Sequence, residues 1–132
     1  MYNSVEEARQ VLTNVSLSAL DRENAVHYLA EQNNPDIVTW LVETLDDDTF
    51  GVRWAAASAL ADMGQVALPA VLSALTTHSG SSWMREGVYH ILHYNSSLLV
   101  REKSAELMAA LKGPGADMAS PAAALRLAQA LR

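Results

Sequence analysis

The sequence predicts an all-α fold: a right-handed α-α superhelix, or α-solenoid, of about four helix pairs. Three observations predict it. Half of the 132 residues are hydrophobic, and 22 alanines and 18 leucines dominate that half, against eleven valines and two isoleucines. Alanine and leucine favour helices, whereas β-branched residues favour strands. An arginine-containing segment recurs about every 32 residues, and a proline-containing segment recurs between its copies. Such two-helix repeats are expected to stack on one another.

The first recurring segment contains Arg22, Arg53 and Arg85, at offsets of 31 and 32 residues. Each arginine is followed three positions later by alanine or valine and seven positions later by leucine. These spacings place the small residues and the leucines on one helical face. We therefore expect this segment to form the second helix of each pair, with small residues such as Ala25 and Ala56 at the helix contacts.

The second recurring segment begins at Pro35 and again at Pro69, an offset of 34 residues. Proline is favoured in the first turn of a helix, where its missing N–H costs nothing. This segment is therefore expected to be the first helix of each pair.

The turns between the segments contain the residues that begin and end helices. Asn34 is the expected N-cap of one helix, Thr49 or residues 46–48 of the next, and Gly64 is expected to end that next helix. The predicted helices, in one domain of residues 1–132, cover residues 4–14, 18–32, 35–45, 50–63, 66–77, 82–94, 98–112 and 120–132.

The segment from Asp47 to Gly64 resembles a HEAT-like repeat, similar to those of phycobilisome bilin lyase subunits. In that family an acidic turn precedes Val-Arg, followed by Ala-Ala, leucine and glycine, as in Val52-Arg53 and Ala56-Ala57 here. The resemblance implies a HEAT-like solenoid over nearly the whole chain. It says little about activity, because this fold serves unrelated functions.

The repeated arginines are expected to be structural. Arg53 is placed to reach back to the acidic turn around Asp47 or to the neighbouring repeat, and Arg22 and Arg85 would be placed equivalently. An arginine can make several planar hydrogen bonds at such a site, which lysine cannot.

The resemblance also implies that the second helices line a concave face. Positions just after each repeat arginine, and one and two turns further on, would form three columns there. We predict that these columns bind a partner: Glu23, Trp54 and Glu86; His27, Ser58 and His90; Glu31, Asp62 and Tyr94. Exposed tryptophan and tyrosine are effective interface anchors. For Trp54, packing onto the alanine-rich core is an equal alternative.

Charge narrows the class of partner. Residues 1–99 carry four arginines and twelve carboxylates, whereas residues 100–132 carry five basic and three acidic residues. The acidic body argues against nucleic-acid or membrane binding. We expect a non-catalytic scaffold in the cytoplasm that holds a basic or amphipathic protein segment, with no cofactor. The alternative is a bilin-lyase-like subunit or chaperone that holds a tetrapyrrole, which a spectral change on adding bilin would reveal. DNA-lesion binding, as in HEAT-like alkylpurine glycosylases, is disfavoured by the charge.

Two further segments carry alternatives. Glu86, His90 and His93 have spacings that allow one divalent metal ion, but a Glu–His helix pair with a packed His93 is the favoured interpretation. The expected last helix is apolar almost all round, so it is either wrapped by the end of the solenoid or available for self-association.

Overall fold

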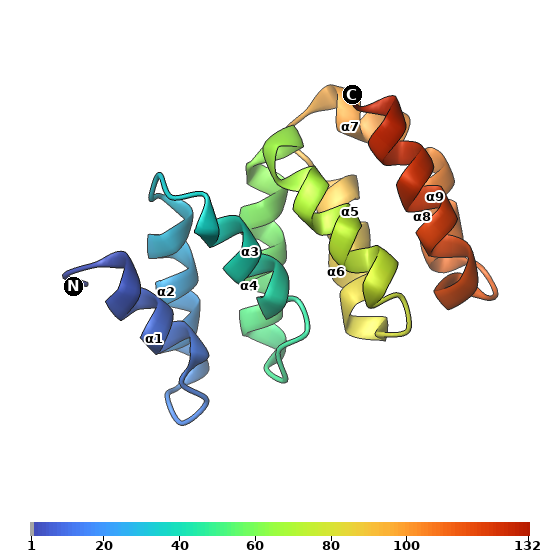
Figure 1. The fold of residues 1–132 in the computed structure, drawn as a ribbon. Coiled ribbons are helices and arrows are strands. Elements are labelled where there is room, and N and C mark those ends of the chain that lie inside the picture. Colours follow the sequence, from blue (N-terminus) through green and yellow to red (C-terminus); the bar gives the residue numbers. More distant parts are fainter. Residues whose placement is uncertain (1) are drawn as a thin grey trace.

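The computed structural model describes residues 2–132, and its helices form a stack of antiparallel pairs (Figure 1). This confirms the all-α solenoid. The elements are α1 (Val5–Thr13), α2 (Ala19–Ala30), α3 (Asp36–Thr44), α4 (Phe50–Asp62), the 3-10 turn η1 (Gly64–Ala67), α5 (Leu68–Thr77), α6 (Ser82–His93), α7 (Leu98–Lys103), α8 (Ala105–Lys112) and α9 (Ala116–Ala130). No helix within residues 2–132 combines the length and apolar character needed to cross a bilayer.

Serine side chains begin four of the helices. The hydroxyls of Ser4, Ser18, Ser81 and Ser97 each accept a hydrogen bond from a backbone N–H in the first turn that follows. This satisfies one of the donors that a helix start leaves free. At α3 the N-cap is Pro35, one residue after the expected Asn34, whose side-chain oxygen accepts from the Asp36 N–H at 2.9 Å in the turn before the helix.

The helices lie in two layers that share one aliphatic core. Helices α1, α3 and α5 form one layer and α2, α4 and α6 the other, and the core between them is built from buried leucine, valine, isoleucine and alanine side chains. Ala25 and Ala56 are fully buried, as their expected contact positions require. At Gly87 a Cβ atom would lie 3.1 Å from Leu45, so this glycine lets α6 approach its neighbour closely.

The fourth pair departs from the sequence prediction in its arrangement. Residues 98–112 were expected to be one helix, but the chain divides at Ser104 into α7 and α8. The Ser104 hydroxyl donates back to the Val100 carbonyl, a bond that competes with regular helix continuation. Helix α8 then packs beside α6, and α9 packs beside α5. In the first three pairs the first helix joins the layer of α1, α3 and α5. In the fourth pair α8 instead joins the layer of α6, and the last helix, α9, joins the layer of α5.

The last helix also begins earlier than predicted. The sequence predicts a last helix over residues 120–132, yet α9 starts at Ala116 and contains Pro121. The earlier start follows from Gly115, whose φ of 67° lies in the left-handed region that glycine adopts easily. This residue turns the chain sharply enough for the helix to begin at the next position.

Candidate functional site

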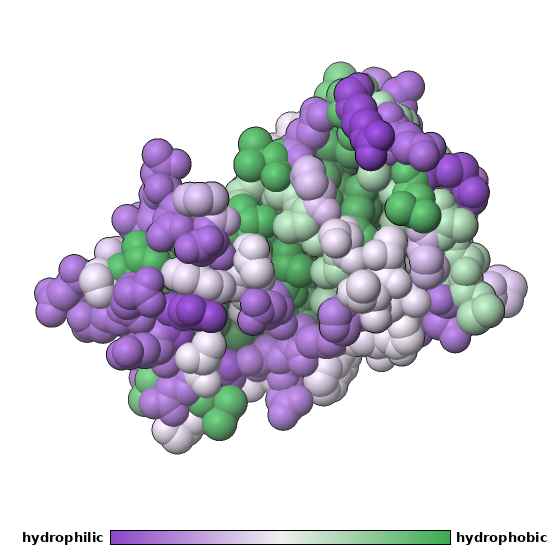
Figure 2. Space-filling model, viewed as in Figure 1, coloured by the Kyte–Doolittle hydropathy of each residue, from purple (hydrophilic) through white to green (hydrophobic). Residues whose placement is uncertain are grey.

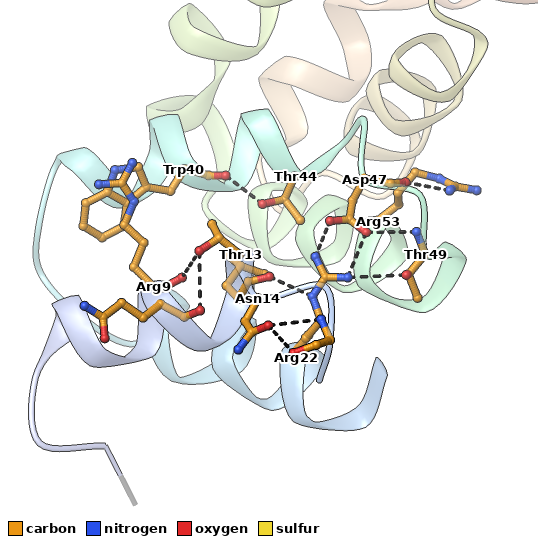
Figure 3. Close-up of polar contacts among 12 residues, drawn as sticks. Arg9, Thr13, Asn14, Arg22, Trp40, Thr44, Asp47, Thr49 and Arg53 are labelled. Carbon is orange, nitrogen blue, oxygen red and sulfur yellow. Dashed lines mark hydrogen bonds and ion pairs between the residues drawn. The ribbon is translucent and has the colours of Figure 1, made fainter. Parts of the chain in front are cut away.

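Arg22 is buried and holds three elements together (Figure 3). Its side chain extends from α2, where only 3% of the residue is exposed. The Nε atom donates to the Leu12 carbonyl at the end of α1 at 2.8 Å, and the two terminal nitrogens bond both carboxylate oxygens of Asp47. Asp47 in turn accepts from the Thr49 N–H at 2.9 Å, beside the start of α4. The guanidinium is therefore occupied by internal partners.

Arg53 and Arg85 make a different contact from Arg22. Each donates from Nη1 to the carbonyl six residues earlier, Arg53 to Asp47 at 2.8 Å and Arg85 to Ser79 at 2.5 Å. Arg22 differs because its guanidinium reaches the turn of the next repeat, where both terminal nitrogens bond the Asp47 carboxylate. Arg53 and Arg85 are therefore equivalent as expected, whereas Arg22 is not.

Trp54 has an exposed ring on the surface between α4 and α6. The residue is 46% exposed. Its ring stacks on Phe50 with centroids 5.9 Å apart and contacts the His90 ring at 4.1 Å. Trp54 thus lies on the molecular surface rather than folded into the alanine-rich core, with Phe50 and His90 as its aromatic neighbours.

The other two residues of the first column differ in accessibility. Glu86 is exposed on α6. Glu23 is half-buried, and its carboxylate lies so close to Gly51, in the first turn of α4, that a Cβ atom there would be 2.5 Å away. A carboxylate is favoured at the positive end of a helix. Glu23 therefore has a structural environment, whereas Glu86 is accessible.

His90 differs from its expected position on an accessible face, because only 9% of it is exposed. The Ser58 hydroxyl lies 3.2 Å from His90 Nε2, and the rings of Trp54 and Tyr94 cover the imidazole at centroid distances of 4.1 and 4.8 Å. The small Ser58 side chain on α4 leaves room for this ring. Burial lowers the pKa of His90, with a smaller contribution from His93, while Asp62 opposes the shift. His90 supports the exposed rings.

The Ser58–His90 pair is close enough for proton transfer, but its surroundings do not suit acyl transfer. A serine nucleophile needs preorganised donors for the oxyanion that develops. Ser58 lies in the middle of α4, where the helix uses the neighbouring backbone N–H groups. The pair therefore acts as a cross-link between α4 and α6.

Most of the remaining column residues line an open groove, and Tyr94 lies apart from it at the end of α6. His27, Glu31, Ser58 and Asp62 line a groove of about 430 Å³ between α2 and α4. Tyr94 lies at the end of α6 with an exposed ring that contacts His93 edge-on at 4.5 Å. The structure therefore brings the second and third columns onto the same layer of helices, with exposed carboxylates at one side.

The possible metal ligands Glu86, His90 and His93 do not point toward one common position. The His90 ring lies against Ser58 and Trp54, whereas the His93 ring stacks on Tyr89 at 6.1 Å. Within residues 2–132, no group of three or more metal-ligating side chains is placed to hold an ion.

Sequence reasoning missed two exposed aromatic residues on the same surface. Phe50 and Trp83 precede the repeat arginines Arg53 and Arg85 by three and two positions, so columns that start after the arginine exclude them. The Arg53 guanidinium lies 4.3 Å from the Trp83 ring centroid and 5.8 Å from that of Phe50. Their position in the first turn of a repeated helix was the available signal. We call Phe50, Trp54, Trp83 and Tyr94 the aromatic patch.

Comparison with known proteins identifies the repeat. The family model for HEAT repeats matches residues 5–93, which include α1 to α6 and therefore the aromatic patch except Tyr94. No curated protein and no solved structure matches the chain. HEAT repeats are generally protein-interaction scaffolds and are typically not enzymes. The chain belongs to the HEAT-repeat family.

Proposed function

We propose that this chain is a protein-interaction module that binds a segment of a partner protein on the face formed by α2, α4 and α6. The aromatic patch is the observation that carries the proposal. Its four members are exposed large rings on two adjacent helices of a HEAT-repeat chain, with Tyr94 at the C-cap of the second helix. Isolated apolar residues are common on protein surfaces, but a group of aromatic rings is typical of binding sites.

The patch is well prepared for binding because its rings are already held in place. Trp54 stacks on Phe50 and rests on His90, and Trp83 lies against the Arg53 guanidinium, which itself donates to a backbone carbonyl. A side chain that is ordered before binding loses less entropy when a partner covers it. Aromatic anchors of this kind contribute about 2 kcal/mol or more each to an interface.

The charges beside the patch favour a basic or amphipathic segment. Glu31, Asp62 and Glu86 are exposed on the same layer of helices. The Arg53 guanidinium within the patch is engaged by the Asp47 carbonyl and by two rings. A partner with lysine or arginine beside apolar residues would complement both features, and its association rate would fall as salt is added.

The experiment is a quantitative pull-down from the native host with three forms of the chain. Trp54→Ala removes the central ring, and Val66→Ala removes an equally apolar, exposed side chain on η1, outside this face. We expect a protein that is retained by the wild type and by Val66→Ala, and lost with Trp54→Ala. Equal retention by all three forms would contradict the proposal. Circular dichroism establishes that both variants are folded.

A further inference from the structure

The imidazole of His90 is enclosed beneath the aromatic patch. Its Nε2 atom lies 3.2 Å from the Ser58 hydroxyl, and the rings of Trp54 and Tyr94 cover it at centroid distances of 4.1 and 4.8 Å. The Nδ1 atom is also buried, and it has no hydrogen-bond partner among residues 2–132. Buried polar atoms without a partner are rare in proteins because they are costly. His90 therefore supports two members of the patch from a site that satisfies only one of its two nitrogens.

Protonation would make this arrangement unfavourable. A neutral imidazole donates from one nitrogen and can accept at the other, whereas an imidazolium donates from both. The Ser58 hydroxyl can accept from Nε2, but Nδ1 would become a buried, charged donor without an acceptor. Such a group is costly to keep away from water. The protonated ring is therefore more stable when it turns out into solvent, away from Trp54 and Ser58.

The charged groups around His90 do not offset this cost. On α4 the Asp62 carboxylate favours the imidazolium, whereas on α6 His93 disfavours it. Glu86 lies one turn earlier on α6 and is exposed, α5 carries no titratable side chain, and the charged residues of α7 and α8 are exposed. The covering aromatic rings also attract a cation. Burial nevertheless has the largest effect and lowers the pKa of His90 in the folded chain.

We propose that His90 makes binding at the α2–α4–α6 face dependent on pH, through the position of its ring beneath the aromatic patch. The neutral ring stays in place and holds Trp54 and Tyr94 ready for a partner. The protonated ring leaves, so that its contacts with Ser58 and with both covering rings are lost. This inference rests on the proposed function and adds that the partner is held at neutral pH and released in mild acid.

The sign and size of the response follow from one proton. A partner that covers the patch binds the neutral form, so its affinity is complete above the pKa of His90 and falls as the pH drops through it. One pH unit below that pKa, the affinity should be about tenfold lower. Carboxylates ordinarily titrate near pH 4, so a comparison between about pH 7.5 and about pH 5 mainly reports on histidines.

The apolar groove between α5 and α9 has no such group. Figure 2 shows hydrophobic surface between these two helices, which belong to the opposite layer. The residues that line the groove include Leu68, Leu72 and Leu125 but no histidine. A response through a buried imidazole is therefore a property of the α2–α4–α6 face.

The first measurement uses the free chain and needs no partner. An NMR titration follows the His90 ring and the Trp54 indole from about pH 7.5 to about pH 5. We expect nuclear Overhauser contacts between the two rings at neutral pH, and their loss with the midpoint at which His90 is protonated. The Trp40 indole, on α3 in the other layer, should not respond. Contacts that persist once His90 is protonated would overturn the inference, whatever the partner is.

The second measurement compares retention of the protein captured in the pull-down at pH 7.5 and at one pH unit below the His90 midpoint. We expect the wild type to hold it about tenfold more weakly at the lower pH. His90→Gln and His90→Phe cannot be protonated there, and the second keeps a ring under Trp54, so each should lose no more than about twofold. His78→Gln is the matched control, because His78 is exposed at the end of α5 and its loss should leave the response intact.

The outcomes separate this inference from the proposed function. Equal retention by the wild type at both pH values would overturn the inference, and so would a full loss of retention in the two His90 variants. A wild type that captures no protein at pH 7.5 contradicts the proposed function itself. Circular dichroism at both pH values establishes that every form is folded.

Discussion

Replacing Arg22 by methionine should destabilise the fold more than any other single change of a charged residue in this chain. The substitution keeps a long apolar side chain but removes the hydrogen bond to the Leu12 carbonyl and both bonds to Asp47. Breaking a buried ion pair by removing one partner typically costs about 3–5 kcal/mol. Asp47 retains some contact with water, since 16% of its side chain is exposed. We therefore expect the lower end, about 3 kcal/mol.

Urea unfolding followed by far-UV circular dichroism measures this cost. A loss of about 3 kcal/mol is a large part of the total stability of a domain, about 5–15 kcal/mol. With a denaturant slope of about 2 kcal/mol per molar, the midpoint should fall by about 1.5 M. Arg126→Met is the matched control, because Arg126 forms its ion pair with Glu106 on the exposed surface. Its midpoint should be unchanged, as expected for an exposed pair.

The reasoning would be refuted if Arg22→Met and Arg126→Met unfolded at the same urea concentration. Asp47→Asn provides an independent check on the pair. Because Arg22 and Asp47 contact each other directly, the cost of the double variant should be smaller than the sum of the two single costs. Additive costs would show that the two side chains stabilise the fold separately.

Three further predictions follow from individual residues. Gly64→Ala should lower the free energy of unfolding by about 1–2 kcal/mol, measured by urea unfolding, because Gly64 has a φ of 67° and a Cβ atom would lie 2.9 Å from Ser96 Oγ. Arg53→Met should cost about 1 kcal/mol in the same assay, since it removes one hydrogen bond to a backbone carbonyl. The pKa of His90 is lowered in the folded state, so the unfolded state binds more protons near pH 6 and stability should fall as the pH decreases below about 6.5. His90→Gln should show a shallower fall between pH 7 and about pH 5 than the wild type, and equal slopes would contradict the role assigned to burial.

Much of the fold could be predicted because the repeat pattern is local. The arginine, the small residue and the leucine of each repeat lie at helical spacing, and the expected end signals at Asn34, Thr49 and Gly64 fall within two residues of helix ends found in the structure. The reversed fourth pair could not be predicted, because nothing in residues 98–132 records which layer each helix joins. That choice depends on long-range packing between α9 and α5.

The candidate surface could be predicted in part. Helical spacing placed Trp54, Ser58 and Asp62 on one side of α4, and Ser58 meets His90 of the next repeat across the helix interface. Spacing could not predict that His90 would be covered by two rings, or that Glu23 would lie against Gly51, because both depend on distances between helices. The similarity to bilin lyase subunits stays a prediction.

The three tryptophans offer the most direct test of binding at the α2–α4–α6 face. Trp54 and Trp83 belong to the aromatic patch, whereas Trp40 lies on α3 in the other layer, under the Arg9 guanidinium at 4.5 Å. Their indole N–H signals can be followed separately by NMR while the protein captured by the wild type is added. The account predicts that the signals of Trp54 and Trp83 shift and that of Trp40 does not. Binding that shifts Trp40 and leaves Trp54 and Trp83 unchanged would contradict it.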